Sequence, residues 1–460
     1  MVALVLLLLV ASAAGVGAKP SGPSGACMER FATEQTVRYG LAEQFVAERD
    51  TGAMGALPTL TPFWVDMVNS DVVGLDGAGV HIAVLDTGLV PEWPYFLPYA
   101  HIATDLGKGF SHDVKWDSKV GDFVWGPVDD DRGFLTNKWG SGHGTHVTST
   151  ITGFYIPAYD GPHWVAGVAP GVTIIPVLVL DTWFLKCPDP DYVNEEWGAE
   201  CHDGRVVFNG GSWEMVAAGI YYAANLAPLL DGPLVITMSL GGDAPDEGVR
   251  AAIDYAISMG VIVIASAGNA GYAGMGWPGA YPEVISVGAA GWTQQWAWPS
   301  FWRDVDVPEM LNTEDLWGNN WQIYLEEFSS RPNRDLGQKP FDLDVVGPGA
   351  SIVGPYKVET YWDGSSWVTT GPSWYYLWGT SMSAPHVAGI SALVLQVDPF
   401  IDQMRMEAVL TVAAAGLPFA ADGAWVVDPW YGLYHFSWYG PDWGSGFLTA
   451  DQAVGVALHR

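Results

Sequence analysis

Basic residues are scarce in this chain. Nineteen Lys and Arg stand against 51 Asp and Glu, which gives a formal net charge of −32 over 460 residues. A surface of that sign repels phosphate groups, so the balance argues against nucleic acid or an anionic membrane as a partner. It suits a secreted or salt-exposed protein. The 24 tryptophans are unlike a chain adapted to concentrated salt, and salt adaptation stays open.

Cysteine is also rare, with three residues in the whole chain. That number is too small for a disulfide scaffold. Cys187 and Cys201 flank a loop rich in Pro, Asp and Glu, and they would close it in an oxidising compartment. Cys27 lies in an N-terminal extension and would be lost if that extension is removed.

Long hydrophobic runs are missing after the first 18 residues. MVALVLLLLVASAAGVGA at 1–18 has an apolar core followed by small residues, which is typical of a secretory signal peptide. No Lys or Arg precedes the core, so an uncleaved anchor or a misassigned start is the alternative. Later apolar runs are only as long as strands. We therefore expect a secreted, extracellular protein that has no membrane association beyond export.

Short β-branched runs alternate with amphipathic segments along most of the chain. The runs GVHIAVLD, GVTIIPVLVL, LVITMSL and VIVIASAGN are typical of strands, and SWEMVAAGIYYAANL and EGVRAAIDYAISMG are typical of helices. This alternation predicts an α/β fold, a three-layer, doubly wound and mainly parallel sheet with helices on both faces. In such sheets the chemistry gathers beyond the carboxyl ends of the strands. No fixed-period repeat is present.

Three stretches interrupt the alternation, near 181–211, 290–327 and 353–377. The last two are rich in Trp, Tyr, Asp and Gly and show no helical or strand continuity. We interpret all three as surface insertions. Their aromatic residues are expected to pack these loops onto the domain, with a dedicated ligand platform as the alternative.

Four polar side chains stand where apolar segments begin or end. GVHIAVLD ends in Asp86, VIVIASAGN ends with Asn269, and His143 follows a glycine at a helix start. Ser381 stands at the mouth of an apolar helix, where the helix dipole places partial positive charge. Together they offer an acid, an oxyanion donor, a base and a nucleophile, the roles that acyl transfer needs. Taken alone, Ser381 could equally cap its helix, with Pro385 tolerated in the first turn.

A series of motifs decides between these interpretations. AVLDTG, SGHGTHV, GVAPGV, TMSLGG, ASAGN, WPGAYPEVISVGA and GTSMSAPHVAG follow one another along the chain. On these motifs the chain resembles the subtilisin-like serine proteases, over roughly residues 60–455. The resemblance implies a serine endopeptidase that forms an acyl-enzyme intermediate, acts on polypeptides, needs no cofactor for its chemistry and works as a monomer. It also implies a division into a signal peptide at 1–18, a short extension or propeptide at 19–58 and a catalytic domain at 59–460.

The resemblance also assigns the four polar side chains. Asp86 would hold the tautomer of His143, which would take the proton of Ser381 as that serine attacks the scissile carbonyl. Asn269 would bind the oxyanion together with the backbone amide of Ser381.

Substrate binding follows from the same resemblance. Ser239-Leu240-Gly241 would offer a strand edge to an extended peptide. Ala267-Gly268 would form the opposite wall of the pocket for the residue before the cut. Gly276 aligns with the pocket floor, where the missing side chain leaves room for a large apolar group. We therefore expect a preference for bulky hydrophobic residues before the cut.

Other residues have simpler explanations or depart from the family pattern. His146 and His386 are expected to be structural, since HGTH lacks the glutamate of a zinc-protease motif. Thr148-Ser149 replaces the usual small pair after HGTHV, and Trp378 on the approach to Ser381 puts broad specificity in doubt. The acidic run Asp129-Asp130-Asp131 offers oxygen ligands for a structural calcium ion on a loop, with a charged surface turn as the alternative.

Two rival functions are considered. Asp-Thr-Gly also marks aspartic proteases and occurs at Asp50 and Asp86. The two copies are too close in sequence for two lobes, and the first ends a polar helical run. The second rival is a catalytically silent member of the same family that binds through its aromatic insertions. All four chemical residues are present, which favours the enzyme.

Overall fold

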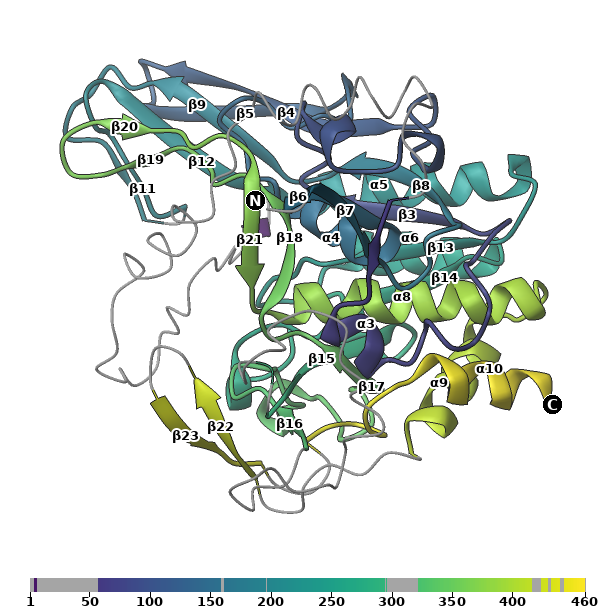
Figure 1. Ribbon diagram of the computed structural model, residues 1–460. Helices are drawn as coiled ribbons and strands as arrows, with labels where there is room; N and C mark the ends of the chain where they lie inside the picture. Colours follow the sequence, from purple (N-terminus) through teal and green to yellow (C-terminus); the bar gives the residue numbers. More distant parts are fainter. Residues whose placement is uncertain are drawn as a thin grey trace.

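The computed structural model describes residues 4–5, 57–158, 161–195, 197–293, 295, 322–415, 423–428, 432–438 and 442–459 (Figure 1). The predicted signal peptide, apart from Leu4–Val5, lies outside the described residues. The same holds for nearly all of the predicted extension at 19–58 and for most of the 290–327 insertion.

A mainly parallel sheet forms the centre of the domain. Its strands lie in the order β16-β15-β14-β13-β3-β8-β4-β5, and β17 pairs with β15. All neighbouring pairs from β15 to β4 in this order are parallel, and so is the pair of β15 with β17. The edge strands β16 and β5 are antiparallel to their neighbours β15 and β4. The strands are β3 (His81–Asp86), β4 (Lys108–Asp117), β5 (Asp122–Arg132), β8 (Thr173–Leu178), β13 (Leu234–Met238), β14 (Ile262–Ser266), β15 (Ile285–Trp292), β16 (Ile323–Leu325) and β17 (Val345–Pro348).

Helices cover both faces of this sheet, so the predicted three-layer α/β fold is confirmed (Figure 1). On β3, Ile82 and Val84 join one core, and Ala83 and Leu85 join the other, because successive side chains of a strand point to opposite faces. The first core is closed by α3 (Phe63–Met67), α4 (His143–Thr152), α8 (Thr380–Val397), α9 (Gln403–Ala414) and α10 (Ala450–Leu458). The second is closed by α5 (Trp213–Leu226) and α6 (Glu247–Ser258).

Smaller sheets and turns surround the central one. The remaining strands are β1 (Leu4–Val5), β2 (Thr59–Leu60), β6 (Gly153–Ala158), β7 (Gly161–Ala166), β9 (Asp181–Lys186), β10 (Val193–Asn194), β11 (Ala199–Glu200), β12 (Arg205–Ser212), β18 (Ile352–Tyr356), β19 (Tyr361–Trp362), β20 (Trp367–Val368), β21 (Ser373–Leu377), β22 (Ala424–Asp428) and β23 (Gly432–Phe436). Short 3₁₀ turns lie at Trp93–Tyr95, Tyr99–His101, Ala227–Leu229, Gly271–Ala273 and Arg334–Leu336.

The insertion at 353–377 is more regular than its sequence indicates. β18 and β21 pair from Ile352 opposite Leu377 to Tyr356 opposite Ser373, and β19 pairs with β20 at the tip. The expectation of no strand continuity is therefore wrong here. Aromatic side chains stabilise the hairpin across its strands, as in the contact of Trp362 with Trp367 at 5.7 Å between ring centroids.

Candidate active site

Asp86 and His143 meet at the carboxyl end of β3. Asp86 is the last residue of the strand and is fully buried, and His143 is the first residue of α4. The Nδ1 atom of His143 donates to Asp86 Oδ1 at 2.8 Å and lies 2.9 Å from Oδ2. Because a carboxylate only accepts, Nδ1 carries the proton and Nε2 keeps its lone pair.

Local backbone contacts hold this pair in place. The Thr87 N–H donates to Asp86 Oδ1 at 2.7 Å, and the Gly144 N–H donates to Thr87 Oγ1 at 2.9 Å. A Cβ at Gly144 would lie 2.4 Å from the Gly88 carbonyl oxygen. Gly144, the second glycine in SGHGTHV, is therefore required for α4 to approach the end of β3 so closely.

Ser381 lies in the first turn of α8, and its backbone is tied to β13. The N-cap of α8 is Gly379, which makes no side-chain cap hydrogen bond, so Ser381 is not the N-cap of the helix. Pro385 has no N–H to offer the Ser381 carbonyl four residues earlier. Ser239, next after β13, fills that gap by donating its Oγ–H to this carbonyl at 2.7 Å.

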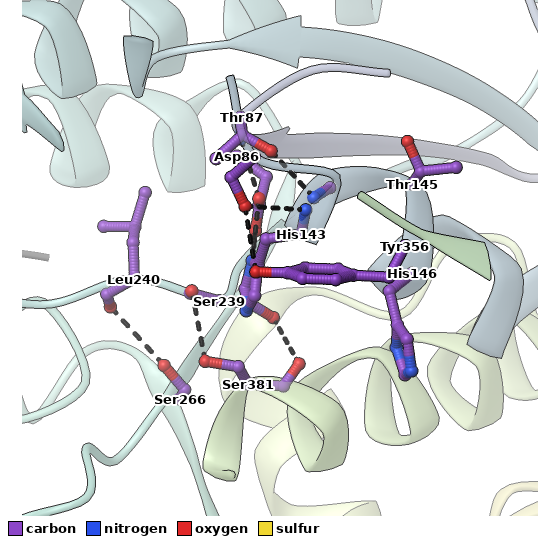
Figure 2. Close-up of polar contacts among 12 residues, drawn as sticks. Asp86, Thr87, His143, Thr145, His146, Ser239, Leu240, Ser266, Tyr356 and Ser381 are labelled. Carbon is purple, nitrogen blue, oxygen red and sulfur yellow. Dashed lines mark hydrogen bonds and ion pairs between the residues drawn. The ribbon is translucent and has the colours of Figure 1, made fainter. Parts of the chain in front are cut away.

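The hydroxyl of Ser381 makes a long hydrogen bond in this structure. Its Oγ donates to the Ser239 carbonyl oxygen at 3.3 Å and not to His143, among the described residues. In the view of Figure 2 the imidazole lies between the Asp86 carboxylate and Ser381. A 3.3 Å contact is weak for an O–H donor, and catalytic hydrogen bonds commonly tighten only when substrate binds.

Asn269 lies beside the N-terminus of α8 with its side chain oriented. Its Oδ1 accepts from the Thr380 N–H at 2.9 Å and from Thr380 Oγ1 at 3.0 Å. These two donors fix the orientation of the Asn269 amide. A Cβ built on Gly379 would lie 3.6 Å from its Nδ2, which places the amide next to the turn that carries Ser381.

The predicted pocket residues also come together. Gly276 donates its N–H to the Ala267 carbonyl at 2.9 Å, and Gly242 and Trp277 exchange backbone hydrogen bonds of 2.9 and 3.0 Å. The segments 239–242 and 267–268 are thereby joined at one end by Gly276 and Trp277. A Cβ at Gly276 would meet the Gly242 carbonyl oxygen at 3.5 Å and no other residue within 3.5 Å.

Comparison with known proteins follows this geometry. The model of the Subtilase family, Peptidase_S8, matches residues 77–428. The chain belongs to the subtilase family. Together with its relatives, this membership makes the protein a subtilisin-like serine endopeptidase.

The relatives of this subtilase are proteases. Subtilisin DY of Bacillus licheniformis is 26% identical over 363 residues, which cover 77% of this chain and 92% of the relative. Subtilisin BL of Lederbergia lenta is 28% identical over 344 residues, with coverage of 75% and 86%. Thermitase of Thermoactinomyces vulgaris is 27% identical over 319 residues, with coverage of 69% and 76%. A solved S41 psychrophilic protease shares the fold, with a TM-score of 0.50, 24% identity and coverage of 86% of this chain and 99% of its own.

The other two histidines near the site of this subtilase are buried. His146 lies on α4 with Nε2 at 3.1 Å from the Ile352 carbonyl oxygen, and burial lowers its pKa to about 3. His386 lies on α8 with Nδ1 at 2.7 Å from the Met382 carbonyl oxygen, and burial lowers its pKa to about 4. Both are neutral around pH 7, which fits the structural role expected for them.

The acidic run at 129–131 lies on a strand. These aspartates belong to β5 and not to a loop, so that part of the expectation is wrong. Asp130 pairs with Lys108 at 3.2 Å, and Asp129 accepts the Asp131 N–H at 2.6 Å. In the part of the chain that the structure describes, no group of three or more His, Cys, Asp or Glu is arranged for a metal ion.

Two further observations concern the cysteines and the helices. Cys187 and Cys201 are free thiols in the structure, and the Cys201 Sγ lies 3.8 Å from the Cys187 carbonyl oxygen. Among the described helices, none combines the length and the apolar character that a membrane span requires.

Sequence reasoning missed the residues that support the site. Thr380 orients Asn269, and Ser239 bonds the backbone of Ser381 in addition to its expected place on the strand edge. The position of Pro385, four residues after Ser381, was a signal for that second contact. The hairpin at 353–377 gave no such signal, although its Tyr356 hydroxyl lies 3.1 Å from Ser141, two residues before His143.

Proposed function

We propose that this subtilase hydrolyses peptide bonds with Ser381 as nucleophile, His143 as general base and Asp86 as the residue that orients the imidazole. The observation that carries the proposal is the contact of Nδ1 of His143 with the buried carboxylate of Asp86, at 2.8 and 2.9 Å. That contact leaves the lone pair of Nε2 available for the proton of Ser381.

The reaction then follows in two halves. The Ser381 Oγ attacks the scissile carbonyl carbon while its proton moves to Nε2, and the carbonyl oxygen becomes an oxyanion. Nδ2 of Asn269 and the Ser381 N–H donate to that oxyanion. Nε2 returns the proton to the leaving amine, and water attacks the acyl-enzyme by the same route with His143 again as base. Ser381 must first leave its 3.3 Å bond to the Ser239 carbonyl.

The pocket supports a preference for large hydrophobic residues before the cut. The backbone segments at 239–241 and 267–268 form the walls, and Gly276 leaves the floor without a side chain. The apolar start of the chain at 1–18 supports export, and the acidic surface is compatible with a secreted monomer that acts on polypeptides.

A fluorophosphonate probe tests the nucleophile. We expect the purified protein to be labelled on Ser381, with labelling and peptidase activity both lost in Ser381→Ala. Ser239→Ala is the matched serine control, since its hydroxyl contacts only the backbone of the site; it should still be labelled. A folded wild-type protein that resists the probe would instead identify a silent member of the family. Mass spectrometry of peptides from a library reports the pocket preference, and cleavage confined to small or acidic residues would contradict it.

A further inference from the structure

A second carboxyl group, that of Glu359, lies in the hairpin that packs against the loop leading to His143. Gly142 donates its N–H to the Lys357 carbonyl at 2.8 Å, and Thr360 donates its N–H to the Trp139 carbonyl at 3.0 Å. Glu359 stands between these two anchors. Its backbone is therefore fixed beside the residues that immediately precede His143.

One oxygen of the Glu359 carboxyl group lacks a hydrogen-bond partner among the described residues. The Oε2 atom is buried and accepts no hydrogen bond from the described residues. On the same hairpin, the Tyr356 hydroxyl lies 3.1 Å from Ser141 Oγ. A buried acceptor that remains unpaired costs free energy, so such a group is commonly tied to function.

His143 is the charged group that acts on the pKa of Glu359. Burial raises the pKa of Glu359 to about 7, and the charge of His143 opposes that rise. On β18, burial raises the pKa of Tyr356, and the charges of Glu359, Asp86 and Tyr375 raise it further. Lys357 does not neutralise Glu359, since its Nζ donates to the Asn137 carbonyl and the charge that acts on it comes from Glu92.

We propose that Glu359 is a positioning residue whose negative charge stabilises the imidazolium of His143 while Ser381 attacks. This inference rests on the proposed catalytic roles of His143 and Ser381. No extra bond forms or breaks, since the proton that leaves Ser381 stays on Nε2 until it moves to the leaving amine. The imidazolium then lies near two carboxylates, one hydrogen-bonded to Nδ1 and one acting through space.

A specific pH dependence follows. Below neutral pH Glu359 is protonated and has no charge to offer, whereas above it the carboxylate is ionised. The benefit of Glu359 should therefore grow as the pH rises through about 7.

The test compares Glu359→Gln with Asp363→Asn, which removes one charge from the exposed tip of the same hairpin. At pH 9 we expect kcat of Glu359→Gln to be lower by roughly 3- to 10-fold, and at pH 5.5 to equal that of the wild type, because one pKa unit of interaction is tenfold in rate. Asp363→Asn should follow the wild type at both pH values. A loss of equal size at every pH would show a merely structural role and overturn the proposal.

A direct titration separates this proposal from the catalytic one. In a Ser381→Ala background, NMR follows the pKa of His143, which we expect to fall by roughly 0.5 to 1 unit on Glu359→Gln and to stay unchanged on Asp363→Asn. Glu359→Asp keeps the charge and should give an intermediate value, which provides a test if the Gln variant does not fold. An unchanged pKa of His143 in these variants would overturn the role of Glu359 alone, whereas peptidase activity that survives Ser381→Ala would overturn the proposed function.

Discussion

Asn269→Leu is the most informative single change at this site. Leucine has nearly the shape of asparagine but loses Nδ2, the proposed oxyanion donor. Loss of the equivalent donor in subtilisin itself lowers kcat by roughly 10²–10³-fold, or about 2.7–4 kcal/mol of transition-state stabilisation. We expect a loss of that order here and little change in KM, because the oxyanion exists only after attack.

The structure predicts a second effect of this substitution. Oδ1 of Asn269 accepts from the N–H and the hydroxyl of Thr380, and Thr380 is fully buried. Leucine would leave both donors without an acceptor, at a cost of about 1–3 kcal/mol for a buried group. A lower melting temperature should therefore accompany the lower kcat.

Asn269→Asp separates the two effects. An aspartate keeps the acceptor for Thr380 but places a negative oxygen where the oxyanion would form. We expect a melting temperature close to that of the wild type and a kcat at least as low as that of Asn269→Leu. The assay is steady-state hydrolysis of a peptide substrate, with thermal unfolding measured on the same preparations. A folded Asn269→Leu protein with wild-type kcat would refute the assignment of Asn269.

Three further predictions concern stability and specificity. Ser239→Ala leaves the Ser381 carbonyl without its 2.7 Å donor and should lower the free energy of unfolding by about 1–3 kcal/mol. Pro385→Ala restores an N–H four residues after Ser381, so the double variant should melt at a higher temperature than Ser239→Ala. A double variant that is no more stable than Ser239→Ala would contradict this. Glu359 binds its proton more tightly in the folded protein, because burial raises its pKa from 4.5 to about 7. The stabilisation that comes from this bound proton is therefore complete below pH 4.5 and is lost as the pH rises through 7. Glu359→Gln should thus be more stable than the wild type at pH 8.5, by up to roughly 3 kcal/mol, and similar at pH 4.5 in thermal unfolding; equal stability at both pH values would argue against a buried titrating carboxyl. Gly276→Val should lower kcat/KM for peptides with Phe before the cut by about 10-fold or more and leave Ala substrates nearly unchanged, whereas an unaltered preference would show that Gly276 is not the floor.

Local patterns predicted the parts of the site that depend on single strands and helices. The run GVHIAVLD is long enough to define β3 and to place Asp86 at its end, and VIVIASAGN does the same for Asn269 beyond β14. The parallel arrangement then brings these ends to one edge of the sheet, since Leu85 lies opposite Met238 and Met238 opposite Ala265. The architecture and the predicted pocket both follow from this register.

Pairing between distant segments was not visible in the sequence. The loop before His143 is held by residues 357–360, more than 200 positions away, through backbone groups that carry no side-chain signal. The acidic end of β5 was taken for a turn because its charged residues hide the alternation of an edge strand, whose solvent face needs no apolar side chains. Backbone contacts between segments far apart in the sequence could therefore not be predicted from it.

The first turn of α8 shows how the sheet controls the chemistry. Two adjacent residues of that turn are bonded to two adjacent strand ends: Thr380 to Asn269 beyond β14, and Ser381 to Ser239 beyond β13. Because β13 and β14 are neighbours in the sheet, their ends cannot shift independently. The nucleophile and the proposed oxyanion donor are thus fixed relative to each other by backbone pairing, and a substitution at either contact should affect folding stability and turnover together.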